Sequence, residues 1–150
     1  MKSRTRARSL ALQVLYEIDI AQHSPADVLR LRLEETPLSD DLAEFARQIV
    51  FGVLPLTHQL DHAISRYAPE WPLDQIAAID RNILRMACWE LAVKRETPVK
   101  VAINEAVELA KVYGSDSAAR FVNGVLGALV DHQYELEQEL KVPTNSSDTG

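Results

Sequence analysis

Hydrophobic residues recur every three or four positions along most of this chain of 150 residues. An α-helix turns by roughly 100° per residue, so this spacing puts them on one helix face. Capping residues and prolines divide the pattern into segments, and Pro55 either separates two helices or bends one. The pattern therefore predicts about seven helices, over residues 7–22, 25–35, 39–67 (one bent helix, or two closely joined ones over 39–53 and 56–67), 73–94, 98–113, 116–130 and 131–140.

The composition favours an all-α fold. The chain has only five glycines, its seven prolines lie at helix edges, and it has no hairpin dipeptide such as Asn-Gly. We expect a single domain over 1–142, with a linker at 69–72 between an N-terminal helical subdomain (about 7–68) and a C-terminal one (about 73–140). The polar residues 143–150 are predicted to be a disordered tail.

The segment from Thr97 to Leu126 reads as two helices joined at Gly114. Thr97 is expected to cap the first helix, and Gly114 to end it in a left-handed conformation. Lys100, Asn104 and Lys111 line a polar edge opposite the apolar stripe, free to bind a partner. In the second helix Phe121 lies roughly 80° from the centre of the stripe, beside the outward-pointing Arg120. This pair suggests a stacking platform for an unpaired base, and the alternative is that Phe121 fills the margin of the core.

The first residues are basic in an otherwise acidic chain. Lys2, Arg4, Arg6 and Arg8 give the first sixteen residues a charge of +4, which leaves −10 on the remainder of a chain whose net charge is −6. Any contact with nucleic acid must therefore be confined to a local basic patch. We expect residues 1 to about 6 to be a loose arm that wraps phosphates.

Other function classes have little support. No apolar run approaches the roughly 20 residues that span a bilayer, and the lone Cys88 cannot form an internal disulfide, so we expect a soluble, cytoplasmic protein. No nucleophile elbow, phosphate-binding glycine loop or dinucleotide motif occurs, so neither catalysis nor a cofactor is expected. His58 and His62, with Asp61 between them, could share a helix face and ligate a metal, but isolated surface histidines are the more common meaning, and no metal is predicted.

Several blocks of the sequence resemble the NusB family of transcription antitermination factors over roughly residues 4–130. The blocks are Ala7-Arg8, Ala11 to Tyr16, Ile79-Asp80-Arg81 with Ile83-Leu84-Arg85, Pro98 with Lys100 to Lys111, and Phe121 to Leu126. The resemblance implies two helical bundles and a protein that binds boxA RNA together with the ribosomal protein NusE. With other Nus factors, such a complex helps RNA polymerase read through terminators, notably in ribosomal RNA operons.

The resemblance also implies roles for particular residues. The RNA surface includes Arg4, Arg6 and Arg8, and the region of Asp116, Arg120 and Phe121, to which we add Lys100 and Lys111 from the polar edge. The surface for NusE includes Tyr16, Asp80 and Arg85, although Asp80 could instead be a helix cap and Tyr16 a rim residue. Two alternatives stay open: a helical homodimer or larger homo-oligomer, and an RNA-recruiting module like that found ahead of ribosomal RNA methyltransferases.

Overall fold

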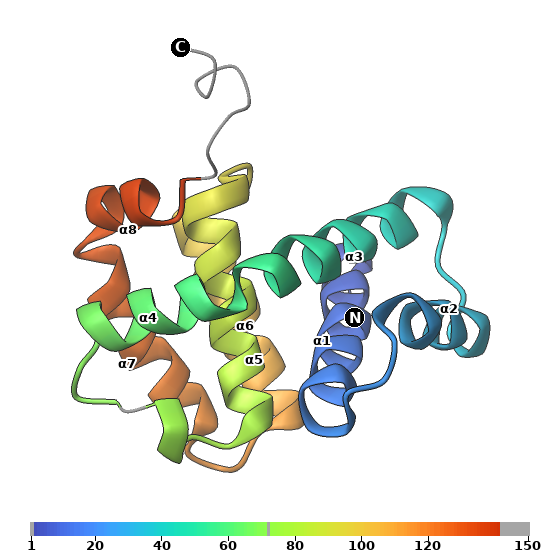
Figure 1. Ribbon diagram of the computed structural model, residues 1–150, viewed down its shortest axis with the longest axis horizontal. Coiled ribbons are helices and arrows are strands. Elements are labelled where there is room, and N and C mark those ends of the chain that lie inside the picture. Colours follow the sequence, from blue (N-terminus) through green and yellow to red (C-terminus); the bar gives the residue numbers. More distant parts are fainter. Residues whose placement is uncertain (1, 72, 142–150) are drawn as a thin grey trace.

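Helices form where the hydrophobic spacing predicts them. The computed structural model describes residues 2–71 and 73–141, and no β-strand occurs in this part of the chain. The all-α prediction is confirmed, and the predicted tail 143–150 lies outside the described residues. The α-helices are α1 (Ser3–Ala21), α2 (Pro25–Glu35), α3 (Asp40–Val53), α4 (Thr57–Tyr67), α5 (Ala78–Trp89), α6 (Val99–Tyr113), α7 (Ala118–Val130) and α8 (Gln133–Glu139) (Figure 1).

Short turns of other helix types join or extend these elements. A 3-10 turn, η1 (Leu54–Leu56), contains Pro55 and connects α3 to α4, so the proline separates two closely joined helices. A second, η2 (Leu73–Gln75), precedes α5, and a π-helical turn, η3 (Glu90–Lys94), continues it. The predicted helix over 73–94 is therefore three consecutive helical pieces.

The ends of α6 differ from the prediction. Thr97 does not cap the helix, because its hydroxyl donates a hydrogen bond to Glu90 Oε2 at 2.9 Å. Gly114 ends the helix in an extended conformation (φ −93°, ψ −177°) rather than a left-handed one. The glycine is needed for space: a Cβ there would lie 2.4 Å from Ala118 Cβ and 2.9 Å from Asp80 Oδ1.

The start of the chain is also more ordered than expected. α1 begins at Ser3, so the prediction of a loose arm over residues 1–6 is wrong for the described residues 3–6. Two contacts stabilise this first turn. Thr5 Oγ1 donates a hydrogen bond to Glu105 Oε1 at 2.7 Å, and the Arg4 guanidinium lies 4.3 Å from the centre of the Phe45 ring.

α5 occupies the centre of the molecule. It contacts α1 and α3 on one side and α4, α6 and α7 on the others, and α8 packs on η3, α4 and α7 (Figure 1). The division into two subdomains stays a prediction. α4, which that division assigns to the N-terminal group, packs on α5, α7 and α8.

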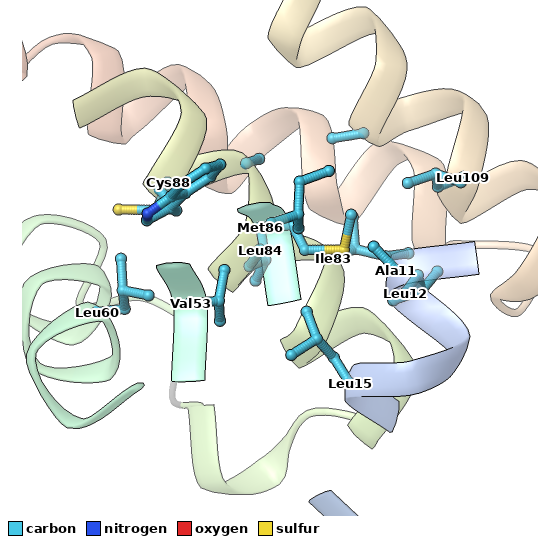
Figure 2. Packing of buried hydrophobic residues seen from close by; sticks show 14 of the residues in the cluster. Ala11, Leu12, Leu15, Val53, Leu60, Ile83, Leu84, Met86, Cys88 and Leu109 are labelled. Atoms are coloured by element: carbon cyan, nitrogen blue, oxygen red, sulfur yellow. The ribbon is translucent and has the colours of Figure 1, made fainter. Parts of the chain in front are cut away.

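One hydrophobic core joins all of these helices. Figure 2 shows Leu12 and Leu15 of α1, Val53 of α3, Leu60 of α4 and Leu109 of α6 together with Ile83 and Leu84 of α5. All of these side chains are buried. α5 is apolar nearly all round because it has neighbours on every side, as the sequence predicts for a central helix.

Two glycines provide a test of the packing around α5. A Cβ on Gly52 of α3 would lie 2.4 Å from Cζ2 of the Trp89 ring, whereas a Cβ on Gly127 of α7 would have nothing within 4 Å. We predict that Gly52→Ala lowers the free energy of unfolding by about 1–3 kcal/mol through overpacking. Gly127→Ala should raise it by about 0.5–1 kcal/mol, because alanine favours helix. Urea denaturation followed by circular dichroism measures both, and equal effects of the two substitutions would contradict this packing.

Candidate nucleic-acid interface

The start of α1 is a cationic helix end. Lys2, Arg4 and Arg6 are exposed, and the first turn of the helix contains no acidic residue. Unpaired amides at a helix N-terminus favour anions, and nearby cations add to that preference. This end of the molecule can therefore attract phosphate groups.

Arg8 does not share this surface. Its side chain is buried, with 3% of the residue exposed, and it forms a two-fold ion pair with Glu90, from Nε at 2.7 Å and from Nη2 at 2.8 Å. Its Nη1 donates to Glu105 at 2.8 Å. Although burial opposes the charge, the two carboxylates outweigh it and raise the pKa of Arg8. In this structure all three guanidinium nitrogens serve the interior, which corrects the prediction that Arg8 contacts RNA.

Arg4 and Arg6 point away from each other. They are two residues apart on a helix, which separates them by about 200°. Arg4 lies over Phe45 of α3, whereas Arg6 lines a hollow of about 230 Å³ beside Arg32 of α2 and Tyr113 of α6. The basic residues of α1 therefore serve two separate parts of the surface.

Polar side chains connect α1 with α6. Besides the contacts of Thr5 and Arg8 with Glu105, Ser9 forms a hydrogen bond with the Tyr113 hydroxyl, and Gln13 Nε2 donates to the same hydroxyl at 2.9 Å. Tyr113 is the last residue of α6, so this contact links the basic helix start to the turn that leads into α7.

The predicted edge of α6 is exposed. Lys100, Asn104 and Lys111 all face solvent, in agreement with the helical spacing. The two lysines differ in their surroundings, because Lys111 Nζ lies 3.6 Å from Glu108 and Lys100 has no carboxylate within 4 Å among the described residues. Lys100 is therefore the more available cation.

The start of α7 carries the remaining predicted residues. Asp116 and Arg120 are exposed, and Phe121 is half-buried, with its inner side packed against the hydrophobic core. Phe121 thus has a part in the core margin and a part open to solvent. Within the described residues no hydrogen bond, ion pair or cation–π contact joins it to the arginines of α1, and their joint action on RNA stays a prediction.

Only the folded structure shows which cations have no carboxylate partner, because the pattern of a single helix does not reveal it. Most arginines have a carboxylate within 4 Å, but in the described part of the chain Arg4, Arg6, Lys100 and Arg120 have none. Lys2 and Lys141 share this property. Apart from Lys141, these cations lie at or near the starts of α1, α6 and α7. Their charge is available to an external anion.

The three residues predicted to face NusE lie at different depths. Tyr16 is half-buried and lines a hollow of about 380 Å³ with the start of α5, residues 77–79. Asp80 and Arg85 are buried, each with 7% exposed. Arg85 donates to Asp61 twice at 2.7 Å and to Asp19 at 3.3 Å, so it joins α5 to α4 and α1. Asp80 and Arg85 thus lie mostly beneath the surface, although Arg85 lines a hollow beside Asp61, and their contact with NusE stays a prediction.

Asp80 has an unusual environment. It lies in the first turn of α5, but its side chain caps no amide, and Oδ1 is buried without a hydrogen-bond partner among the described residues. Burial raises the pKa of the Asp80 carboxyl. The cap suggested by the sequence is therefore absent, and the ionised carboxylate carries a cost.

The histidines do not form a metal site in the described residues. No group of three potential ligands is close enough there to hold an ion. His62 Nε2 instead lies 3.4 Å from Glu139 of α8. Among the described helices, none combines the length and hydropathy that crossing a bilayer requires.

The fold and this surface define a class: a small all-helical protein with unpartnered cations at the starts of helices and a half-buried aromatic ring, suited to an anionic polymer. The chain belongs to the NusB family, because the NusB family model matches residues 5–131. The transcription antitermination protein NusB of Roseiflexus sp. (strain RS-1) is 48% identical over 134 residues, which is 88% of this chain and 94% of that protein. Its counterpart in Dehalococcoides mccartyi (strain ATCC BAA-2266 / KCTC 15142 / 195) is 46% identical over 127 residues, 85% of this chain and 89% of that protein.

Solved structures of the family have the same fold. T. maritima NusB superposes with a TM-score of 0.79 at 31% identity, covering 89% of this chain and 98% of that one. A crystal structure of the antitermination factors NusB and NusE in complex with dsRNA gives a TM-score of 0.80 at 28% identity, covering 88% of this chain and 98% of the matched chain.

The contrast between Arg8 and Arg6 can be measured. We predict that Arg8→Gln lowers the free energy of unfolding by about 3–5 kcal/mol, because it leaves Glu90 buried without its charged partner. Arg6→Gln removes the same charge from an exposed site and should stay within about 0.5 kcal/mol of the wild type. Chemical denaturation compares the two variants, and equal stabilities would show that Arg8 is not a structural residue.

The environment of Asp80 predicts a pH effect. An acid whose pKa is raised in the folded state binds more protons there than in the unfolded state, so stability falls as pH rises from the ordinary pKa to the raised one. Asp80→Asn replaces the carboxyl with an amide that does not ionise, so the variant does not lose this stability as the pH rises. The free energy of unfolding of the variant relative to the wild type should therefore rise as the pH increases above about 4, the ordinary pKa of an aspartate, and then level off. A difference that does not change with pH would contradict the burial of this carboxylate.

Proposed function

We propose that this protein binds boxA-type single-stranded RNA together with NusE. In this role it acts in transcription antitermination, and with other Nus factors it lets RNA polymerase read through terminators, notably in ribosomal RNA operons. The single observation that carries the RNA-binding part is the set of unpartnered cations at the starts of α1, α6 and α7 in a chain of net charge −6. The family membership and the relatives' names support the rest.

Each part of the surface has a distinct role in this proposal. Arg4, Arg6, Lys100 and Arg120 bind phosphates, and Lys111 contributes less because Glu108 shares its charge. The open side of Phe121 stacks on an unpaired base, and Asp116 accepts hydrogen bonds from base amino groups. Backbone contacts position the RNA, while the base contacts distinguish its sequence.

NusE binds on the side where Tyr16 and residues 77–79 line a hollow of about 380 Å³. Tyr16 suits such a site because an aromatic ring with a polar tip contributes much contact area at low entropic cost. Asp80 and Arg85 act behind this surface: Arg85 holds α4 and α1 against α5 and so sets the position of Tyr16.

The protein has no catalytic role in this proposal and works in the cytoplasm, where its RNA and ribosomal partner are found. A homodimer remains the rival arrangement. Analytical ultracentrifugation with and without RNA and NusE distinguishes the RNA-binding protein from the homodimer. A dimer that dissociates when RNA and NusE are added agrees with the proposal. A dimer that binds neither RNA nor NusE would contradict it.

The role of Phe121 can be tested against a matched phenylalanine. We predict that Phe121→Ala weakens binding to boxA RNA by about 1–3 kcal/mol, roughly 5- to 150-fold, because one base loses its stacking partner. Phe51→Ala is the control, since Phe51 lies on α3 with 41% exposed. Fluorescence anisotropy with boxA and scrambled single strands, each with and without NusE, measures the effect, and a double-stranded boxA probe tests which form is preferred. An unchanged affinity with a large loss of stability would assign Phe121 to the core alone.

A further inference from the structure

A groove lies between α1, α2 and the end of α6. It consists of two adjoining hollows of about 230 and 380 Å³, which share Gln13, Arg32 and Tyr113 in their walls. Arg6 borders the smaller hollow and Tyr16 the larger one. The groove therefore runs from the basic start of α1 toward the surface proposed for NusE.

The smaller hollow has the character of an anion site. Arg6 reaches it from α1 and Arg32 from α2, and no carboxylate lines it. Hydroxyl groups of Ser9, Thr36 and Tyr113 are further hydrogen-bonding groups in its wall. Two cations from two helices, with hydroxyl groups in the same wall, suit the several oxygens of one phosphate group.

Arg32 is held in place for such a role. Its Nη1 donates to Gln13 Oε1 at 2.8 Å and its Nη2 to Glu17 Oε1 at 3.1 Å, while 32% of the side chain stays exposed. A guanidinium already ordered by the protein loses little entropy when it binds a ligand. Glu17 offsets part of the charge of Arg32, whereas Arg6 has no carboxylate within 4 Å in the described residues, so the two arginines together keep a net positive charge.

We propose that the smaller hollow binds a backbone phosphate of the RNA, with Arg32 of α2 as a phosphate-binding residue opposite Arg6. This inference rests on the proposed function and adds α2 to its surface. An RNA backbone fits better than an acidic protein segment, because Arg6 lies one helical turn from Lys2, another exposed cation with no carboxylate partner among the described residues. Tyr113, in the wall of the hollow, is followed by the turn into α7, so a strand leaving the groove there approaches Arg120 and Phe121.

The test compares two arginines on one helix. Arg30 lies two residues from Arg32 but on the outer face of α2, where it pairs with Asp27 and Glu34. Arg32→Gln and Arg30→Gln remove the same charge. We expect Arg32→Gln to weaken boxA RNA binding about tenfold and to reduce the slope of log affinity against log salt by about 0.7, one phosphate contact on a single strand. Arg30→Gln should leave the slope unchanged.

A second variant avoids removing an internal contact. Thr36 is exposed where α2 ends, so Thr36→Glu adds a carboxylate at the wall of the hollow and should also weaken RNA binding. Gln59→Glu, at an exposed position of α4 away from the hollow, is its control. Circular dichroism verifies that all four variants fold.

The outcomes separate the groove from the wider function. If the wild type binds boxA RNA but Arg32→Gln and Thr36→Glu bind it equally well, the groove proposal is wrong and the function stands. If these variants lose affinity for NusE while RNA binding is unchanged, the groove holds a protein segment, which also overturns the proposal. If the wild type binds no RNA with or without NusE, the proposed function fails, and the groove proposal fails with it.

Discussion

The buried ion pair between Arg8 and Glu90 determines how α1 lies against the rest of the molecule. Taking charges out of water costs several kcal/mol per ion, so such a pair persists only with close geometry and further hydrogen bonds. Both are present, because two guanidinium nitrogens meet the two oxygens of Glu90 and the Thr97 hydroxyl donates to the same carboxylate. With Arg8 held inside, the rotation of α1 is set, and Arg6 must face outward. The geometry of the RNA surface thus depends on an interaction in the interior.

α5 carries a second polar centre on another of its faces. Arg85 precedes Glu90 by five residues, which places the two about 140° apart around the helix. Asp61 of α4 and Asp19 of α1 neutralise Arg85, just as Arg8 neutralises Glu90. A central helix with apolar faces alone could slide or rotate against its neighbours with little penalty. Two buried charges on different faces, each with a partner on α1, oppose that movement.

Local patterns predict the helices of this protein, whereas contacts distant in sequence decide its site. The spacing of apolar residues is sufficient for each helix because burial of one face depends only on near neighbours. Arg6 and Arg8 look alike by the same reading, and what separates them is a carboxylate 82 residues away. Arg85 is likewise fixed by carboxylates far away in the sequence, those of Asp19 and Asp61. The turn at Gly114 also could not be predicted from local sequence. A glycine is needed there because Asp80 and Ala118 lie too close for a side chain, and not because the helix ends in the usual left-handed conformation.

The charge distribution bears on how an anionic protein holds an anionic polymer. At physiological salt the Debye length is about 8 Å, so the distant acidic residues are largely screened and the strand senses mainly the cations near it. Those cations are few, because most arginines are already paired, and a small number of phosphate contacts gives limited affinity. A second attachment point multiplies that affinity through effective concentration, without any new contact to this chain. Under the proposed function NusE supplies that attachment, and a groove that leads from Arg6 to Tyr16 places the RNA and the protein partner next to each other.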